Sequence, residues 1–327
     1  LDGARMQSEA AYQTRQAFWI ALGLSVPYWL LCYFSEPLLV AFRIDPAIVP
    51  HAAGYLRALS WGAPGLCLVL LLRYFSEGTG NTQPTMFYGV VGALVNIPLN
   101  YVLMFGKLGF PALGPVGCGY ATSIVIWLQF VFLLAYIATQ RHYRPYSLLS
   151  RLEMPDAKAI FGLLKVGLPI AVAIAVEGSL FVGAALLIGR LGPVPAAAHL
   201  IAINFSALVF MIPVGLASAI SIRVGNALGR GDPGGARYAG YIGLVIVFGF
   251  QTVSAAAMFL APELIVRIYT DDVVVGSLAV SLLFYAAIFQ YPDGIQMVMA
   301  GALRGYKDTR WPMLYTCLLY TSDAADE

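Results

Sequence analysis

The chain has 327 residues, of which 60 % are hydrophobic and 11 % are charged, and its mean hydropathy is +0.78. This composition excludes an ordinary water-soluble globular protein, because soluble domains carry about 25 % charged residues. The formal net charge of +2 gives no indication of a nucleic-acid partner.

Eight apolar stretches are long enough to cross a bilayer, since a spanning helix needs roughly 17–25 mostly apolar residues. In chain order they cover about 16–35, 53–72, 84–106, 117–139, 164–189, 195–221, 238–262 and 276–303. An outer-membrane barrel would instead show alternating segments of about ten residues, a pattern that this sequence lacks. The sequence therefore predicts an all-α polytopic membrane protein.

Lys and Arg are concentrated in alternate loops between these stretches. If the segment before Gln16 is cytoplasmic, the outer loops hold only a few of the 19 basic residues, namely Arg43, Arg57, Lys107, Arg190 and Arg267. By the positive-inside rule, this asymmetry predicts that both ends of the given chain lie on the cytoplasmic side. The basic loops need no nucleic acid to explain them.

The two halves of the chain resemble each other at an offset of about 226 residues. Residues 36–40 (EPLLV) fall on 262–266 (PELIV), and 78–82 (GTGNT) fall one residue further along on 305–309 (GYKDT). Copies in the same orientation need an even number of spans per repeat, which we take as six. We therefore expect an N-terminal lobe over 1–139 (spans 3–6), a cytoplasmic linker over 140–163 and a C-terminal lobe over 164–316 (spans 7–10). In this interpretation spans 1–2 and 11–12 of a twelve-span protein are missing, and 317–327 resembles a translated sequencing adapter.

Five short motifs occur along the chain in a specific order: LVNIPLNY at 94–101, GPVGCGYAT at 114–122, NFSALVFM at 204–211, SIRVG at 221–225 and LRGYKD at 303–308. In these motifs the chain resembles NorM-type transporters of the multidrug and toxic compound extrusion (MATE) family over about residues 1–316. The resemblance implies a MATE-like two-lobe fold around a central cavity. It also implies cation-coupled export of drugs and organic cations, with Na⁺ or H⁺ as coupling ion and no cofactor.

Glu177 and Asp293 are carboxylates deep inside apolar stretches. Glu177 lies between the charge-free runs 166–176 and 178–189, and Asp293 between 273–292 and 294–303. A carboxylate at the bilayer centre costs about 2.5–3.5 kcal/mol on insertion scales, so it is rare unless it faces a cavity, a proton or a cation. Carboxylate oxygens suit a hard cation such as Na⁺, and the resemblance implies that both acids bind and couple the cation. The alternative is a pair of buried structural acids, bonded to neighbouring polar groups or paired with an Arg from a loop.

Two further polar residues lie in the same predicted lobe. Gln290 precedes Asp293 by three residues and so shares its helix face, where it would help to shape the site. Asn204, with Phe205 beside it, would present an amide and an aromatic wall to a drug, although helix packing explains it almost as well. Phe289 and Leu200 stand where some family members carry Tyr and Gln, so Na⁺ coordination through those two side chains is not expected.

The resemblance identifies Asn96, Asn100 and Thr122 as the polar cluster of the N-terminal lobe. Asn96 and Asn100 are four residues apart and share a helix face, and Pro98 between them favours a kink that would line a cavity. The alternative is that the two amides bond across helices as packing contacts. His199 is similarly open to two interpretations, as a proton relay or as a packing residue.

The sequence lacks the motifs G-x-x-x-x-G-K-[ST], H-E-x-x-H and G-x-S-x-G, and its four Cys residues form no C-x-x-C pair. We therefore expect no enzyme, but a monomeric antiporter of the bacterial inner membrane that uses an ion gradient, with small-molecule drugs and membrane lipid as partners. One alternative is a lipid-linked saccharide flippase of the same superfamily, which would line its cavity with Arg or Lys. The other is a membrane-embedded lipid enzyme, which would show a carboxylate or His cluster at an interface.

Overall fold

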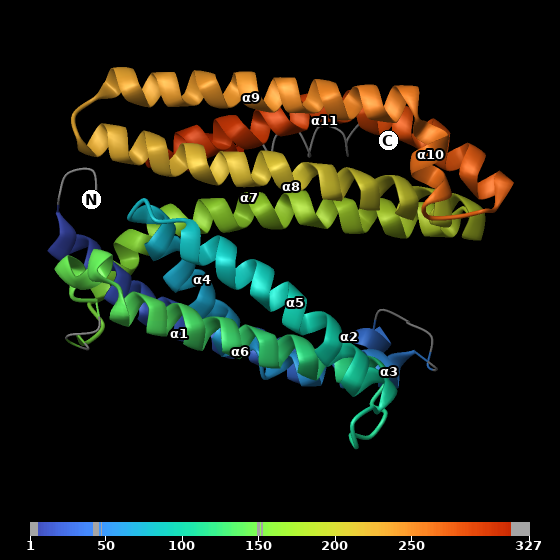
Figure 1. The fold of residues 1–327 in the computed structure, drawn as a ribbon, viewed down its shortest axis with the longest axis horizontal. Helices are drawn as coiled ribbons and strands as arrows, with labels where there is room; N and C mark the ends of the chain where they lie inside the picture. Colours follow the sequence, from blue (N-terminus) through green and yellow to red (C-terminus); the bar gives the residue numbers. More distant parts are fainter. Residues whose placement is uncertain (1–5, 42–45, 47, 149–150, 152, 315–327) are drawn as a thin grey trace. The chain divides into compact units, whose positions relative to one another are not determined.

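The computed structural model describes residues 6–41, 46, 48–148, 151 and 153–314, and the regular elements of this part of the chain are all helices (Figure 1). Seven helices are long and apolar enough to cross a membrane, or eight if one bent pair is counted as a span. The predicted all-α polytopic fold is confirmed. The predicted adapter segment 317–327 lies outside the described residues. The chain divides into two compact units, Leu1–Phe161 (unit 1) and Gly162–Glu327 (unit 2).

Unit 1 is built on three long helices and one bent pair. Its elements are α1 (Gln7–Tyr33), α2 (Ser35–Ala41), α3 (Val49–Ser60), α4 (Ala63–Gly78), α5 (Gln83–Phe105), α6 (Pro115–Thr139) and the short 3-10 helix η1 (Arg141–Tyr146). Helix α1 packs on α3 and α4, and α6 packs on α3, α4 and α5. The core between α4, α6 and η1 is centred on the buried side chains of Leu72, Phe75, Leu133 and Tyr143. The burial of these side chains in the core explains why the helix faces that meet there are apolar.

The predicted single span 53–72 is in fact two helices, α3 and α4, which meet at an angle of 50°. The break falls at Trp61 and Gly62 because Pro64, in the first turn of α4, has no N–H with which to continue the helix. Helix α6 compensates: the Trp127 indole N–H donates to the Trp61 carbonyl at 2.9 Å, and the Ser123 hydroxyl donates to the Ala58 carbonyl at 2.8 Å. Two carbonyls beside the break therefore accept hydrogen bonds from side chains of α6.

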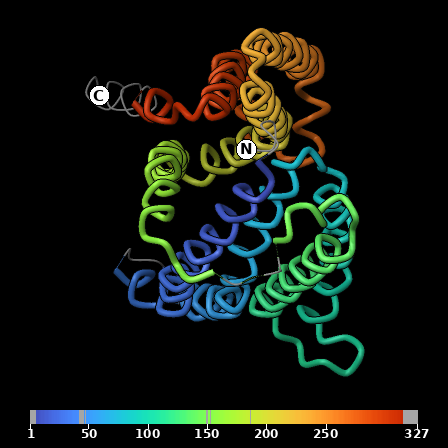
Figure 2. Tube along the Cα trace, turned by 90° about the vertical axis from the view of Figure 1, so that its left-hand side faces the viewer, coloured from blue at the N-terminus to red at the C-terminus, as the bar shows by residue number. Residues whose placement is uncertain are grey.

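The predicted linker 140–163 is shorter than expected, because α7 (Ala157–Arg190) begins inside it. Between η1 and α7 the chain returns to α1, as Figure 2 traces. The hydroxyl of Tyr12 donates to the Asp156 carboxylate at 2.7 Å, which lowers the pKa of Asp156. The Asp156 Oδ1 accepts from the Lys158 backbone N–H at 2.9 Å, so Asp156 both anchors the linker and caps the start of α7. The division between the two units lies at 161/162, within the predicted linker.

Unit 2 contains most of α7 together with α8 (Pro193–Gly229), α9 (Pro233–Leu260), α10 (Pro262–Arg267) and α11 (Val273–Gly305). Helices α8, α9 and α11 lie side by side and pack on one another (Figure 1). Met258 and Leu283 are fully buried in one core cluster, and Val224 and Val298 in a second. Near the second cluster, a Cβ at Gly301 would collide with the Ala217 carbonyl, so only glycine permits this close approach of α8 and α11.

Candidate functional site

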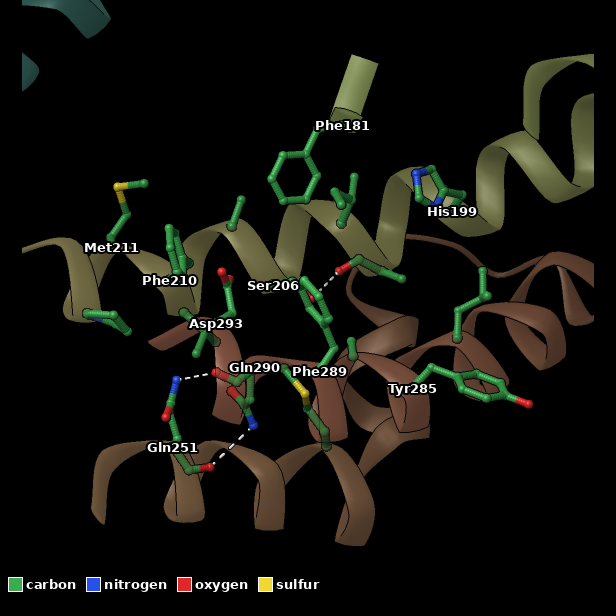
Figure 3. A pocket seen from close by; sticks show the side chains of 18 residues that line it. Phe181, His199, Ser206, Phe210, Met211, Gln251, Tyr285, Phe289, Gln290 and Asp293 are labelled. Carbon is green, nitrogen blue, oxygen red and sulfur yellow. Dashed lines mark hydrogen bonds between the residues drawn. The ribbon is translucent and has the colours of Figure 1, made fainter. Parts of the chain in front are cut away.

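A cavity of about 610 Å³ opens within unit 2 (Figure 3). Its walls are mainly apolar and aromatic, with Phe181 from α7, Phe210 and Met211 from α8, and Tyr285 and Phe289 from α11. On α8 the wall residues 203, 206, 207 and 210 recur at the i, i+3, i+4, i+7 spacing of one helix face. The cavity is large enough for a drug-sized molecule, since such sites measure about 300–1,000 Å³.

Asp293 is the charged residue of this wall. It is half-buried on α11 between Pro292 and Gly294, and its carboxylate points into the cavity, away from Gln251 (Figure 3). Among the described residues, Asp293 has no hydrogen-bond or ion-pair partner. A half-buried carboxylate without a protein partner favours a cation or a proton as its partner. Asp293 therefore lines the cavity, and its binding of a cation stays a prediction.

Gln290 also lines the cavity, but it is 8 % exposed and its polar atoms are bonded to α9. Its Nε2 donates to the Gln251 carbonyl at 3.2 Å, and its Oε1 accepts from the Ser254 hydroxyl at 3.0 Å. In return the Gln251 Nε2 donates to the Gln290 carbonyl (Figure 3). These bonds join α9 to the turn of α11 that carries Asp293.

Glu177 lies on α7, half-buried and outside the cavity wall. It is close enough to Asp293 for the two carboxylates to interact electrostatically. Arg304, near the end of α11, is also close enough to act on Glu177. The two predicted acids thus share one electrostatic environment, but Glu177 has an opposite charge within reach.

Asn204 does not join this site. Its side chain is exposed, and its Oδ1 accepts from the Tyr269 hydroxyl at 3.1 Å, whereas its neighbours Ile203 and Ser206 face the cavity. One residue along an α-helix turns the side chain by about 100°, which carries Asn204 off the wall. His199 does line the cavity. Leu200 lies outside the wall, and Phe289 contributes an aromatic ring in place of a Tyr hydroxyl.

Only two of the three residues of the predicted polar cluster in the N-terminal lobe are connected by a described hydrogen bond. The Asn100 Nδ2 donates to the Asn96 Oδ1 at 2.6 Å, as expected for residues four apart. Thr122 instead donates to the Cys118 carbonyl of its own helix at 2.9 Å. The Asn100 Oδ1 is buried without a partner among the described residues. No described hydrogen bond joins Thr122 to the two amides.

Sequence reasoning missed Gln251 and Ser254. Gln251 is 1 % exposed, and its Oε1 is buried without a partner in the described part of the chain. The available signal was a Gln in the middle of the predicted span 238–262, but its partner on α11 depends on the cross-helix register. The described part of the chain contains no group of three or more His, Cys, Asp or Glu side chains that could hold a metal ion.

Comparison with known proteins identifies the family. The MatE family model matches residues 2–102 and 169–322. The chain belongs to the MatE family. The membership predicted from the five motifs is thereby confirmed, including the NorM-type branch, because NorM proteins are among its similar relatives.

Two relatives illustrate the similarity. Over 320 residues the chain is 47 % identical to the "Probable multidrug resistance protein NorM" of Xanthomonas axonopodis pv. citri, covering 98 % of this chain and 70 % of the relative. Over 323 residues it is 42 % identical to the "Multidrug resistance protein PmpM" of Pseudomonas aeruginosa, covering 97 % of this chain and 67 % of the relative.

Solved structures of MATE transporters share the fold. A MATE crystal structure in the straight conformation superposes with a TM-score of 0.85 at 22 % identity, over 96 % of this chain and 69 % of that one. The eukaryotic MATE transporter AtDTX14 superposes with a TM-score of 0.83 at 21 % identity, over 94 % and 68 %. At these identities the match supports the fold, and function rests on the site and the sequence relatives.

Proposed function

We propose that this protein exports drugs and organic cations by antiport against Na⁺ or H⁺, and that Asp293 carries the coupling ion. The observation that carries the proposal is the Asp293 carboxylate, which faces an aromatic cavity and has no protein partner among the described residues. The multidrug resistance names of the NorM and PmpM relatives support the substrate class. The protein acts as a transporter and not as an enzyme.

The cavity wall suits a broad range of organic cations. Aromatic faces attract cations by about 0.5–2 kcal/mol, and Phe181, Phe210 and Phe289 supply three such rings. Met211 adds a flexible thioether that adapts to different shapes. Asp293 then supplies the one formal charge that a cationic drug and a coupling ion would both seek. Competition for this carboxylate gives exchange: the ion displaces the drug on one side of the membrane, and the drug displaces the ion on the other.

This competition drives transport only if the ion binds one conformation better than the other, because equal affinity for both states shifts no equilibrium. Glu177 adds to the need for a cation, since a second carboxylate within electrostatic reach of Asp293 makes two negative charges costly without one. Asn96, Asn100 and Thr122 remain a predicted polar cluster of the N-terminal lobe.

The saccharide flippase alternative lacks support from this cavity. A pyrophosphate would require Arg or Lys, but the described wall contains Asp293 and neither of these residues. We also propose that the protein is a monomer of the bacterial inner membrane. Both chain ends are cytoplasmic in this proposal, because the distribution of Arg and Lys favours that orientation.

The test is competition between ethidium and the ion on the purified chain. We expect Na⁺ or a fall in pH to displace bound ethidium from the unaltered protein, and Asp293→Asn to abolish that displacement. Asp271→Asn, the same change in an exposed loop, serves as the matched control and should behave like the unaltered protein. Displacement that persists in Asp293→Asn would refute the role of Asp293. Ethidium efflux from vesicles under a Na⁺ gradient, compared with a pH gradient, then identifies the coupling ion.

A further inference from the structure

A second cavity, of about 230 Å³, lies within unit 1 between α1, α4, α6 and the chain that follows η1. Its walls are apolar, with Phe18 and Trp19 from α1, Leu71 from α4 and Phe130 from α6. Its rim is charged, with Arg15, Arg151 and Glu153. The cavity lining thus combines apolar and charged side chains, the two kinds of surface that a lipid chain and a lipid headgroup contact.

The rim carries one uncompensated positive charge. Arg15 pairs with Glu153 at 2.7 Å, and the Arg15 side chain is only 16 % exposed. Arg151 is exposed and has no hydrogen-bond or ion-pair partner among the described residues. The Arg15 Nε is buried and also lacks a described partner, so two guanidinium groups retain N–H donors. Guanidinium groups bind phosphate oxygens well, because their planar donors match phosphate geometry.

Two of the three rim residues belong to a segment that the sequence predicts to be cytoplasmic. Arg151 and Glu153 lie within the predicted linker 140–163, and the Trp19 indole N–H donates to the Glu153 carbonyl at 2.9 Å. Trp residues concentrate at the membrane–water interface, where one edge of the ring is polar and the rest is apolar. Basic pockets between spanning helices on the cytoplasmic side bind anionic lipid headgroups.

From these features we infer that the unit 1 cavity binds an anionic phospholipid. Arg151, together with the free donor of Arg15, holds the phosphate, and the first part of an acyl chain lies along Phe18, Leu71 and Phe130. A free phosphate ion would gain nothing from the apolar walls. A zwitterionic lipid would fill the walls but would not compensate the net positive charge of the rim. This site is independent of the ion that drives transport.

Bound lipid would also hold the linker. Leu148, Arg151 and Glu153 belong to the chain between η1 and α7, and the remaining lining residues belong to α1, α4 and α6. A ligand that bridges them binds the folded arrangement only, so it stabilises that arrangement by mass action. Unit 1 should therefore melt at a higher temperature when this lipid is present.

The experiment measures lipid retained by the purified chain in detergent, by native mass spectrometry, after addition of phosphatidylglycerol or phosphatidylcholine. We expect preferential retention of phosphatidylglycerol and a loss of about five-fold in Arg151→Gln, since one basic residue near a membrane surface contributes about 1 kcal/mol. Arg144→Gln removes the same charge from an exposed position outside the cavity. This control should retain phosphatidylglycerol like the unaltered chain.

A second pair of variants tests the apolar wall. Leu71→Trp fills the cavity, whereas Leu70→Trp adds the same ring on α4 outside it. Phosphatidylglycerol should raise the melting temperature of the unaltered chain and of Leu70→Trp, but not of Leu71→Trp. Equal retention of the two lipids, equal losses in Arg151→Gln and Arg144→Gln, or the same thermal shift with inorganic phosphate alone would each overturn the inference.

Discussion

Replacing Gln290 by Leu is expected to destabilise unit 2 more than replacing Gln251 by Leu, although the two side chains exchange bonds across the same helix pair. Both are buried, at 8 % and 1 % exposure. The asymmetry arises because their hydrogen bonds differ in number. Gln290 uses both ends of its amide across the interface, and Gln251 uses only one.

The magnitude follows from the bonds that each variant loses. Gln290→Leu removes two interhelical bonds, to the Gln251 carbonyl at 3.2 Å and from Ser254 at 3.0 Å, besides a longer bond within α11 to the Ala287 carbonyl at 3.3 Å. Interhelical side-chain bonds in membranes contribute about 0.6 kcal/mol each, so the expected loss is about 1.2 kcal/mol. Gln251→Leu removes one bond, to the Gln290 carbonyl. It also removes the buried Gln251 Oε1, which has no partner among the described residues, and burying such a group costs about 1–3 kcal/mol. The net change for Gln251→Leu is therefore near zero or stabilising.

The assay is equilibrium unfolding of the purified chain in mixed micelles of increasing SDS content, followed by far-UV circular dichroism. The double variant completes a cycle that isolates the coupling between the two side chains. Ser281→Ala is the control, since this exposed hydroxyl on α11 donates to Ser277 of its own helix at 3.2 Å, and no change is expected. A loss in Gln251→Leu as large as in Gln290→Leu would show that the bond accounting is wrong.

Two further changes have defined outcomes. Gly301→Val places a side chain against the Ala217 carbonyl and should cost about 1–3 kcal/mol by overpacking in the same unfolding assay, whereas Gly249→Val, which meets nothing within 4 Å on α9, should cost far less. Tyr12→Phe removes the hydroxyl that lowers the pKa of Asp156 from its ordinary 3.8. A lowered folded-state pKa contributes stability above the unfolded-state pKa and loses it as the pH falls through the folded-state pKa. The stability difference between Tyr12→Phe and the unaltered chain should therefore shrink as the pH falls below about 4, and a pH-independent difference would contradict this reasoning.

Hydropathy located the spans because a spanning helix must bury its backbone polar groups in apolar surroundings, whatever its neighbours are. It could not locate the break between α3 and α4, since neither Trp61 nor Gly62 is charged and the stretch stays apolar enough on average to count as one span. The break depends on Pro64 and on the donors that Ser123 and Trp127 supply from α6. Those donors lie more than 60 residues away in the sequence, and only the folded packing brings them together.

The candidate site shows the same division between local and non-local information. Asp293 was predictable because the cost of a carboxylate in an apolar span is a local property. Which face of α8 lines the cavity was not predictable from the sequence. Asn204 was expected to form part of the cavity wall, but Ile203 and Ser206 line it instead. Gln251 was missed because its importance depends on Gln290, which lies 39 residues further along the chain.

The fourth span of each repeat carries a proline at a similar point, and the two units differ around it. Pro64 in unit 1 and Pro292 in unit 2 differ in position by about 228 residues, close to the repeat offset. In unit 1 the helix breaks, and the Trp127 side chain donates to the Trp61 carbonyl three residues before Pro64. In unit 2 the helix continues, and the Gln251 side chain donates to the Gln290 carbonyl two residues before Pro292.

The residues that follow the two prolines differ in their surroundings. Gly65 is buried, and a Cβ there would lie 3.0 Å from the Ile126 side chain, so this position in unit 1 serves the packing of α4 on α6. Asp293 follows Pro292 and faces a cavity. A proline removes a backbone donor in either case, but α11 continues through Pro292, and Asp293 faces a cavity. The repeat therefore supplies the proline twice, and unit 2 is the copy in which the residue after it faces open space instead of a neighbouring helix.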